Sequence, residues 1–166
     1  RGQSAEPAMV VLATLGKNPV MVYSGQELGE KGMDIEGYSG MDGRTSIFDY
    51  WGVRSIQAWA NHGKFDGKNL DAEQVILRSF YQKLLTIVRE NPAVTDGLMY
   101  DLEYAQGEGF NKHEQFAFLR KNGDELLLVV ANFDDKEVSV NVQVPKEAFE
   151  YLHQPELKRA NALDLL

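Results

Sequence analysis

The spacing of apolar residues along the chain changes several times, and its first part predicts a helix followed by a strand. Residues 5–15 form an apolar stretch with Pro7 near its start and Gly16 after its end, which predicts a short helix. The run Val20–Tyr23 is apolar at every position, as expected of a strand that is buried on both faces. A helix, a tight turn and a fully buried strand form the αβ half of a parallel α/β unit.

Residues 24–70 are rich in glycine and show no sustained period. The segment holds most of the 15 glycines, among interspersed Asp, Asn and Tyr residues. This pattern predicts a long irregular excursion that contains one short helix near Ser55–Asn61. Its aromatic side chains argue against disorder. They are Tyr38, Phe48, Tyr50, Trp51, Trp59 and Phe65.

The clearest helical period runs from Asp71 to Glu90. Asp71 can cap this helix, and Gln74 three residues later completes a capping box. Apolar residues recur at helical spacing and form a broad face. They are Ile76, Leu77, Phe80, Tyr81, Leu84, Leu85, Ile87 and Val88. Pro92 ends the helix.

After Pro92 the period falls to two, which predicts an antiparallel β unit. The expected strands are Leu98–Ala105, Gln115–Lys121, Glu125–Phe133 and Glu137–Val144. Asn122-Gly123 and residues 134–136 are expected to form the hairpin turns. Valines alternate with polar residues in the last strand, so that strand should have one solvated face. The boundary of this unit is expected between Pro92 and Gly97.

Composition narrows the class of protein. With 43% hydrophobic and 10% aromatic residues the chain can build a core, and no apolar run reaches the ~18 residues of a transmembrane helix. The net charge of −8 argues against a nucleic-acid partner, which requires clustered Lys and Arg, and is compatible with neutral substrates such as sugars. The absence of cysteine excludes thiol chemistry, disulfides and cysteine-ligated metals.

The first residues of the chain do not resemble a signal sequence, and the chain begins at Arg1 instead of Met. We therefore expect an excised or processed part of a longer parent protein. The localisation of the parent is unknown from this sequence, which is compatible with a periplasmic or an extracellular protein.

The run from Asn18 to Gly29 resembles the segment around the last barrel strand of the α-amylase superfamily. It reads Asn-Pro-Val-Met-Val-Tyr-Ser-Gly-Gln-Glu-Leu-Gly. The usual pattern in the family is Gly-x-Pro-x-(apolar)-Tyr-x-Gly-x-Glu-x-Gly. Asn18 stands where glycine is common, which is a mild departure.

Further motifs resemble the same family in the same order. Asp42–Arg44 and Phe48–Trp51 fall in the long loop after the last strand, and Phe80–Pro92 resembles the last barrel helix and its exit. Phe116–Arg120 and Leu127–Phe133 resemble two strands of the C-terminal β-sandwich of the family. Each motif alone is weak, and their order along the chain carries the resemblance.

The resemblance implies an α+β fragment, in which the end of a (β/α)8 TIM barrel is followed by an antiparallel β-sandwich. Residues 1–93 would supply the last barrel strand, a long loop and the last helix. Residues 94–166 would form the C-terminal β-sandwich domain, which can extend beyond this chain. Active sites of such barrels lie at the C-terminal ends of the strands, so Ser24–Glu27 would line the mouth, with Gly25 allowing a tight turn.

The resemblance also implies that this chain holds no catalytic residue. Members of the family act by the retaining mechanism, in which one carboxylate attacks the anomeric carbon and another, roughly 5 Å away, protonates the leaving oxygen. In the family these groups follow the fourth and fifth strands, and a third acid lies in an Asn-His-Asp motif after the seventh. No Asn-His-Asp occurs here, and its nearest echo, Asn61–Gly63, lies in the wrong place.

Five residues are candidates for substrate binding. Gln26 and Glu27 would lie at the barrel mouth, although a role of Glu27 in holding backbone amides of the loop is favoured. Asp42 and Arg44 resemble a pair with which some family members hold a sugar a few units from the cut, through directional hydrogen bonds. An ion pair inside the loop is the alternative. Tyr50 can stack on a sugar ring or pack the loop.

Other conspicuous residues have structural explanations. Trp51 and Trp59 are expected to pack the long loop. The three histidines have no partner at metal spacing, and Asp66–Asn69 lacks the acidic spacing of a calcium loop, so it predicts a turn. No metal site or cofactor is evident, while the family resemblance leaves room for a structural calcium ion in the parent.

The expected function is that of the parent, namely hydrolysis of starch-like α-glucans, with an α-glucan or oligosaccharide as substrate. Two alternatives are open. One is transglycosylation or isomerisation of α-glucosides on the same scaffold, and the other is a non-catalytic carbohydrate-binding or transport-associated relative. A lone strand at Val20–Tyr23 would present two unpaired edges, so the fragment is also expected to self-associate.

Overall fold

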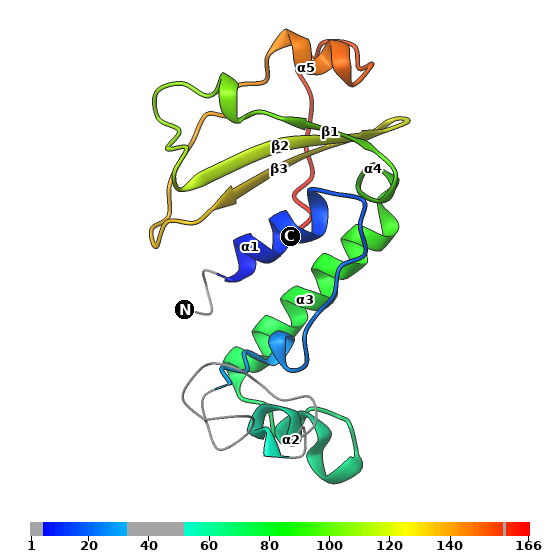
Figure 1. Ribbon diagram of the computed structural model, residues 1–166, viewed down its shortest axis with the longest axis vertical. Helices are drawn as coiled ribbons and strands as arrows, with labels where there is room; N and C mark the ends of the chain where they lie inside the picture. The colour runs from blue at the N-terminus through cyan, green and yellow to red at the C-terminus, as the bar shows by residue number, and fades with distance from the viewer. Residues whose placement is uncertain (1–4, 33–51, 158) are drawn as a thin grey trace. The chain divides into compact units, whose positions relative to one another are not determined.

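The computed structural model describes residues 5–32, 52–157 and 159–166 (Figure 1). The chain divides into two compact units, one of residues 1–20 with 84–166 and the other of residues 21–83. Helix α3, Ala72–Glu90, runs through the division. The boundary predicted between residues 93 and 94 refers to the domains of a longer parent and stays a prediction.

The first unit is built on a three-stranded antiparallel sheet with β2 in its centre. Its strands are β1 (Leu98–Asp101), β2 (Gln115–Asn122) and β3 (Glu125–Asn132). The hairpin predicted between β2 and β3 is confirmed, with Asn122 opposite Glu125 and Gly123 at a φ of 53° in the turn. β1 ends earlier than predicted, because residues 103–105 form a short 3-10 helix, η4.

One face of the sheet carries the hydrophobic core of this unit. Ala117 and Leu119 of β2 point into it, as the period of two requires. Helix α5, Lys146–Tyr151, lies over this face (Figure 1), and its Ala148 is fully buried. The other buried residues of the cluster are Leu102, Phe110 and Leu152.

The opposite face of the sheet packs against two helices. Helix α1, Ala5–Thr14, contacts β3, and helix α4, Pro92–Thr95, contacts β2 and β3 (Figure 1). Helix α1 confirms the helix predicted over residues 5–15. Phe118 and Arg120 of β2 alternate onto this face, and both are almost fully buried.

Arg120 is a buried cation whose partners are main-chain carbonyl groups. Its Nη1 donates to Leu15 at 2.8 Å, directly after α1, and its Nε donates to Ala93 at 2.9 Å. Its Nη2 donates to Val94 and Gly97, at the C-terminal end of α4. Burial lowers the pKa of the guanidinium from its ordinary value. The carbonyl oxygens compensate for the lost water, and they tie both helices to the central strand.

The β2–β3 hairpin also holds the N-terminal end of α4. The carboxylate of Glu125 accepts a hydrogen bond from the Ala93 amide at 3.0 Å, and Asn122 Nδ2 donates to the Pro92 carbonyl at 3.2 Å. An anion at the N-terminus of a helix and a cation at its C-terminus both match the polarity of the peptide dipoles. Helix α4 therefore has a charged side chain of the sheet at each end.

The strand predicted at Val20–Tyr23 is wrong for this structure. These residues have no strand conformation, and the side chain of Met21 is 79% exposed. A strand buried on both faces requires a hydrogen-bonded neighbour, and all strand pairing among the described residues lies in the β1–β2–β3 sheet. Pairing of this segment with a second copy stays a prediction.

The strand predicted at Glu137–Val144 is also absent. Val140, Val142 and Val144 do pack against the core. The alternation of valines with polar residues therefore predicted which side chains face the core, although the segment is not a strand. In place of a neighbouring strand, the buried side-chain amide of Gln106 bonds the backbone of Gln143. It donates to the Gln143 carbonyl at 2.8 Å and accepts from the Gln143 amide at 2.9 Å.

The described residues of the first unit thus show a three-stranded antiparallel sheet with helices on both faces. A second sheet, which a β-sandwich requires, is not formed within the described ranges. The barrel end and the sandwich of the predicted architecture are therefore not confirmed.

The second unit contains η1 (Gln26–Leu28), α2 (Arg54–Ala60), η3 (Asn61–Gly63) and the first part of α3. The short helix predicted near residues 55–61 is α2. The capping box predicted for the long helix is confirmed in both directions. The Gln74 amide donates to Asp71 Oδ1 at 2.8 Å, and the Asp71 amide donates to Gln74 Oε1 at 3.1 Å.

Replacement of Arg120 by Met should lower the free energy of unfolding by at least about 2 kcal/mol, because several buried carbonyl groups would lose their donor. Arg89→Met is the matched control, since Arg89 is largely exposed and its ion pair among the described residues is with the adjacent Glu90. Urea denaturation followed by far-UV circular dichroism measures both variants. Equal midpoints for the two variants would contradict the proposed role of Arg120.

Gly97→Ala should destabilise the first unit by about 2 kcal/mol or more. A Cβ atom at this position would lie 2.2 Å from the Ala93 carbonyl oxygen and 2.6 Å from that of Lys121, and both are backbone atoms. Gly16→Ala is the control, because the nearest atoms there are 3.9 Å away or farther. Thermal unfolding of the two variants under one buffer condition checks the difference. A Gly97→Ala protein as stable as Gly16→Ala would show that the backbone there can shift freely.

Candidate functional site

The turn after Tyr23 is built on Gly25. This residue has a φ of 81°, and an added Cβ would lie 2.8 Å from the Cβ of Glu30. Both the left-handed conformation and the close approach favour glycine. The tight turn predicted at Gly25 is confirmed, and it places the short helix η1 directly after the segment 20–23.

Gln26 lies at the start of η1, and its side chain links three parts of the second unit. Its Oε1 accepts a hydrogen bond from the Tyr23 amide at 3.0 Å, and its Nε2 donates to the Tyr81 hydroxyl of α3 at 2.9 Å. The amide therefore holds the turn onto the long helix. A contact between Gln26 and a sugar stays a prediction.

The carboxylate that supports this turn is Glu30. Its Oε1 accepts the Lys31 and Gly32 amides, each at 2.9 Å, and its Oε2 accepts the Ser55 hydroxyl of α2 at 2.5 Å. The sequence led us to expect this supporting role for Glu27, and the structure gives it to Glu30. The available signal was an acidic residue directly before a Lys-Gly pair, where two successive amides can converge on one oxygen.

Glu27 is half-buried, and its side chain makes no hydrogen bond or ion pair with the residues that the structure describes. The other three candidates for sugar contact, Asp42, Arg44 and Tyr50, lie outside the described residues, as does Trp51. The structure therefore brings together Gln26 and Glu27 on one turn of helix, and the assignment of all five residues to substrate binding stays a prediction.

The loop after α2 is held by a network of amides around Asp66. Asn61 Nδ2 donates to the Asp66 carboxylate at 2.7 Å, and Asn69 Nδ2 donates to Asn61 Oδ1 at 2.8 Å. The hydrogen bond from Asn61 and that from the Lys68 amide lower the pKa of Asp66. The turn predicted at residues 66–69 is confirmed, because the Leu70 amide donates to the Gly67 carbonyl at 3.0 Å.

Trp59 packs within the second unit. Its ring meets that of Phe65 edge to face, with centroids 5.5 Å apart. This contact agrees with the packing role expected for Trp59. Within the described ranges, no group of three His, Asp or Glu side chains is arranged to hold a metal ion, and no helix is long and apolar enough to cross a membrane.

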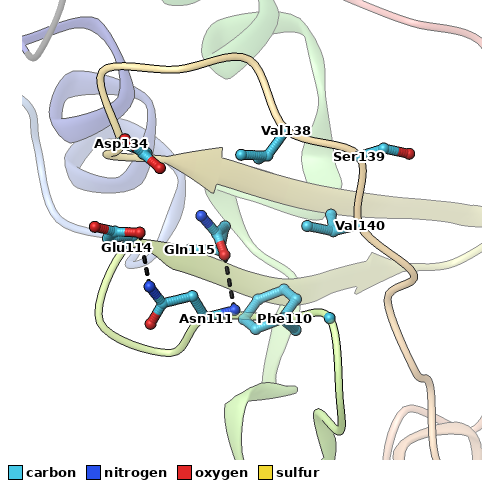
Figure 2. A pocket seen from close by; sticks show the side chains of 9 residues that line it. Phe110, Asn111, Glu114, Gln115, Asp134, Val138, Ser139 and Val140 are labelled. Atoms are coloured by element: carbon cyan, nitrogen blue, oxygen red, sulfur yellow. Dashed lines mark hydrogen bonds between the residues drawn. The ribbon is translucent and has the colours of Figure 1, made fainter.

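An open depression of about 480 Å³ lies on the first unit, at the end of the β2–β3 hairpin opposite its turn (Figure 2). Phe110 and two valines provide its apolar part, and carboxyl, amide and hydroxyl groups provide the rest. It is lined by Gly109, Phe110, Asn111, Glu114, Gln115, Asp134, Val138, Ser139 and Val140.

The polar groups of this depression are largely engaged with one another. Asn111 Nδ2 donates to Glu114 Oε2 at 2.6 Å, and the Asn111 amide donates to Gln115 Oε1 at 2.8 Å (Figure 2). Gln115 Nε2 in turn donates to Asn132 Oδ1 at 2.9 Å. These hydrogen bonds hold the loop before β2 against the end of β3. The polar side chains that form them therefore have a structural role.

One carboxyl group that lines the depression, that of Asp134, has a lowered pKa. A side-chain hydrogen bond with Asp135, together with the backbone amides of Asp135 and Lys136, lowers the pKa of Asp134. A general acid for glycoside cleavage requires a raised pKa, so that the carboxyl group is protonated at neutral pH. The lowered pKa of Asp134 does not match this requirement of a general acid.

The comparisons with known proteins concern this same region of the chain. Residues 110–153 match the family model described as alpha amylase, C-terminal all-beta domain. The matched residues include β2, β3 and α5. No curated protein and no solved structure gave a significant match. The chain is thus similar, over less than half its length, to the C-terminal domain of the alpha-amylase family, which is consistent with a parent that is a glycoside hydrolase.

Proposed function

We propose that the chain is the C-terminal part of a retaining glycoside hydrolase that acts on the α-glucosidic bonds of starch-like glucans. The observation that carries the proposal is the match of residues 110–153 to the alpha-amylase C-terminal domain. It lies downstream of the run Asn18–Gly29, which resembles the last barrel strand of the same superfamily. Two independent resemblances in the expected order support the proposal more than either does alone.

In this proposal the second unit contributes to substrate binding and not to bond cleavage. Gln26 and Glu27 lie on the turn that would follow the last barrel strand, at the end of the barrel where active sites are built. The fixed position of Gln26 between Tyr23 and Tyr81 is compatible with such a role, because binding groups act best when their side chains are already held. Asp42, Arg44 and Tyr50 would extend the same surface.

The nucleophile and the general acid are expected in the part of the parent that precedes this chain. Glu30 is used to hold the turn, and the pKa of Asp134 is lowered, so neither carboxyl group resembles a glycosidic acid. A structural calcium ion in the parent stays compatible with the family resemblance.

The parent should release reducing sugar from soluble starch, whereas the 166-residue chain alone should not. Loss of the nucleophile and the acid removes many orders of magnitude in rate. Proton NMR of the first products should show the α-anomer, as a retaining mechanism requires. Transfer to a second sugar in place of water would favour the transglycosylase alternative, and binding without turnover the non-catalytic one. Turnover by the purified chain that survives Glu27→Gln would contradict the proposed placement.

In the parent, Arg44→Ala should raise KM for long glucans more than KM for a short activated glucoside. A charge-assisted hydrogen bond to a remote sugar contributes roughly 1.5–3 kcal/mol, and only the long substrate would lose it. Steady-state kinetics on both substrates provides the comparison, with Lys64→Ala as a surface-charge control on the same unit. If both substrates are affected equally, Arg44 holds the loop and does not contact sugar.

A further inference from the structure

Three tyrosines gather on the surface of the first unit from three different elements. Tyr100 of β1 has its ring centroid 6.2 Å from that of Tyr104 in η4 and 5.5 Å from that of Tyr151 in α5. The hydroxyl groups of Tyr100 and Tyr104 hydrogen-bond to each other at 2.6 Å. We call these three residues the tyrosine cluster. Tyr104 is 61% exposed and Tyr151 is 51% exposed.

The tyrosine cluster has a fixed base. Tyr100 lies opposite Leu119 in the sheet register and packs against the hydrophobic core. It therefore lies on the face of the sheet that α5 covers, away from the face that packs against α1 and α4. In the proposed parent α1 belongs to the barrel, so the cluster would point away from the barrel side of this unit.

Packing alone does not explain the exposure of the two outer rings. Tyr100 already joins β1 to α5, and a smaller side chain at position 104 would leave that contact in place. Exposed clustered aromatic rings commonly mark a binding surface. Flat rings can contact the apolar C–H face of a pyranose, while their hydroxyl groups reach the sugar hydroxyls.

The polar surroundings of the cluster select against anions. The hydrogen bond with Tyr104 is the main cause that raises the pKa of Tyr100 to about 12, and the charge of Glu147 adds to it. The Tyr100 phenol therefore stays neutral at physiological pH. Asp101 and Glu103 flank the cluster in sequence, and the net charge of the chain is −8. A neutral hydroxyl-rich ligand fits this surface better than a phosphate or uronate polymer.

We infer that the tyrosine cluster is a carbohydrate-binding surface, which holds a neutral glucan chain against Tyr104 and Tyr151. The choice of an α-glucan as the sugar rests on the proposed function. Such a surface would keep a polymeric substrate near the enzyme between cleavage events. It involves no bond making, so it can be measured on this chain without catalysis.

The test is native affinity electrophoresis of the 166-residue chain at neutral pH in gels with and without soluble amylopectin. Amylopectin should retard the wild-type chain, and Tyr104→Ala should weaken the apparent affinity about fivefold or more. Tyr104→Phe keeps the ring and should fall between the two. Phe133→Ala removes another aromatic ring, which is 41% exposed and outside the cluster, and should leave the retardation unchanged. Carboxymethyl-amylose should retard the wild type less.

Three results would overturn the inference. The wild-type chain is not retarded by amylopectin, Tyr104→Ala is retarded as strongly as the wild type, or carboxymethyl-amylose retards the wild type as strongly as amylopectin does. A wild-type dimer in sedimentation that Tyr104→Ala dissociates, without glucan binding, would identify the cluster as a contact between copies. Unfolding midpoints of Tyr104→Ala and wild type should agree, and a large drop together with lost binding would assign the ring to structure. Starch hydrolysis is measured on the parent and glucan binding on the 166-residue chain. Binding by the chain without hydrolysis by the parent would therefore overturn only the proposed function.

Discussion

The first unit depends on one buried cation, the guanidinium of Arg120. Its side chain is 1% exposed, and its hydrogen bonds go to carbonyl groups at the ends of two helices. Removing this charge from water is unfavourable unless those acceptors are present together. The bond to Leu15 spans 105 positions of the chain, so this side chain couples α1 and α4 to the central strand of the sheet.

The position of Arg120 on β2 also decides what each face of the sheet can do. Because Arg120 and Phe118 alternate onto one face, that face is closed by α1 and α4. Leu119 alternates onto the other face, where α5 and a valine-containing segment complete the core. The rings of Tyr104 and Tyr151 lie at the margin of that second core, which gives an exposed aromatic surface a rigid support.

Elements specified by neighbouring residues could be predicted from the sequence, and elements that need a distant partner could not. The Asp71–Gln74 capping box and the hairpin at Gly123 involve residues at most three positions apart, and both are present. The apolar run Val20–Tyr23 gives the same signal whether or not a neighbouring strand exists, and here it has none within the described residues. Burial of Arg120 has no periodic signal, since its acceptors are backbone atoms of remote segments.

The same distinction applies to the candidate site. The sequence pattern indicated a tight turn at Gly25, because a glycine requirement is local. It did not indicate which carboxylate supports that turn, since the answer depends on Ser55, 25 positions away. Gly25 lets the backbone approach the stem of Glu30, and the Glu30 carboxylate accepts the hydrogen bonds of the Lys31 and Gly32 amides. The carboxylate of Glu27 makes no hydrogen bond or ion pair within the described residues, so this turn is supported by Glu30, and a contact of Glu27 with substrate stays a prediction.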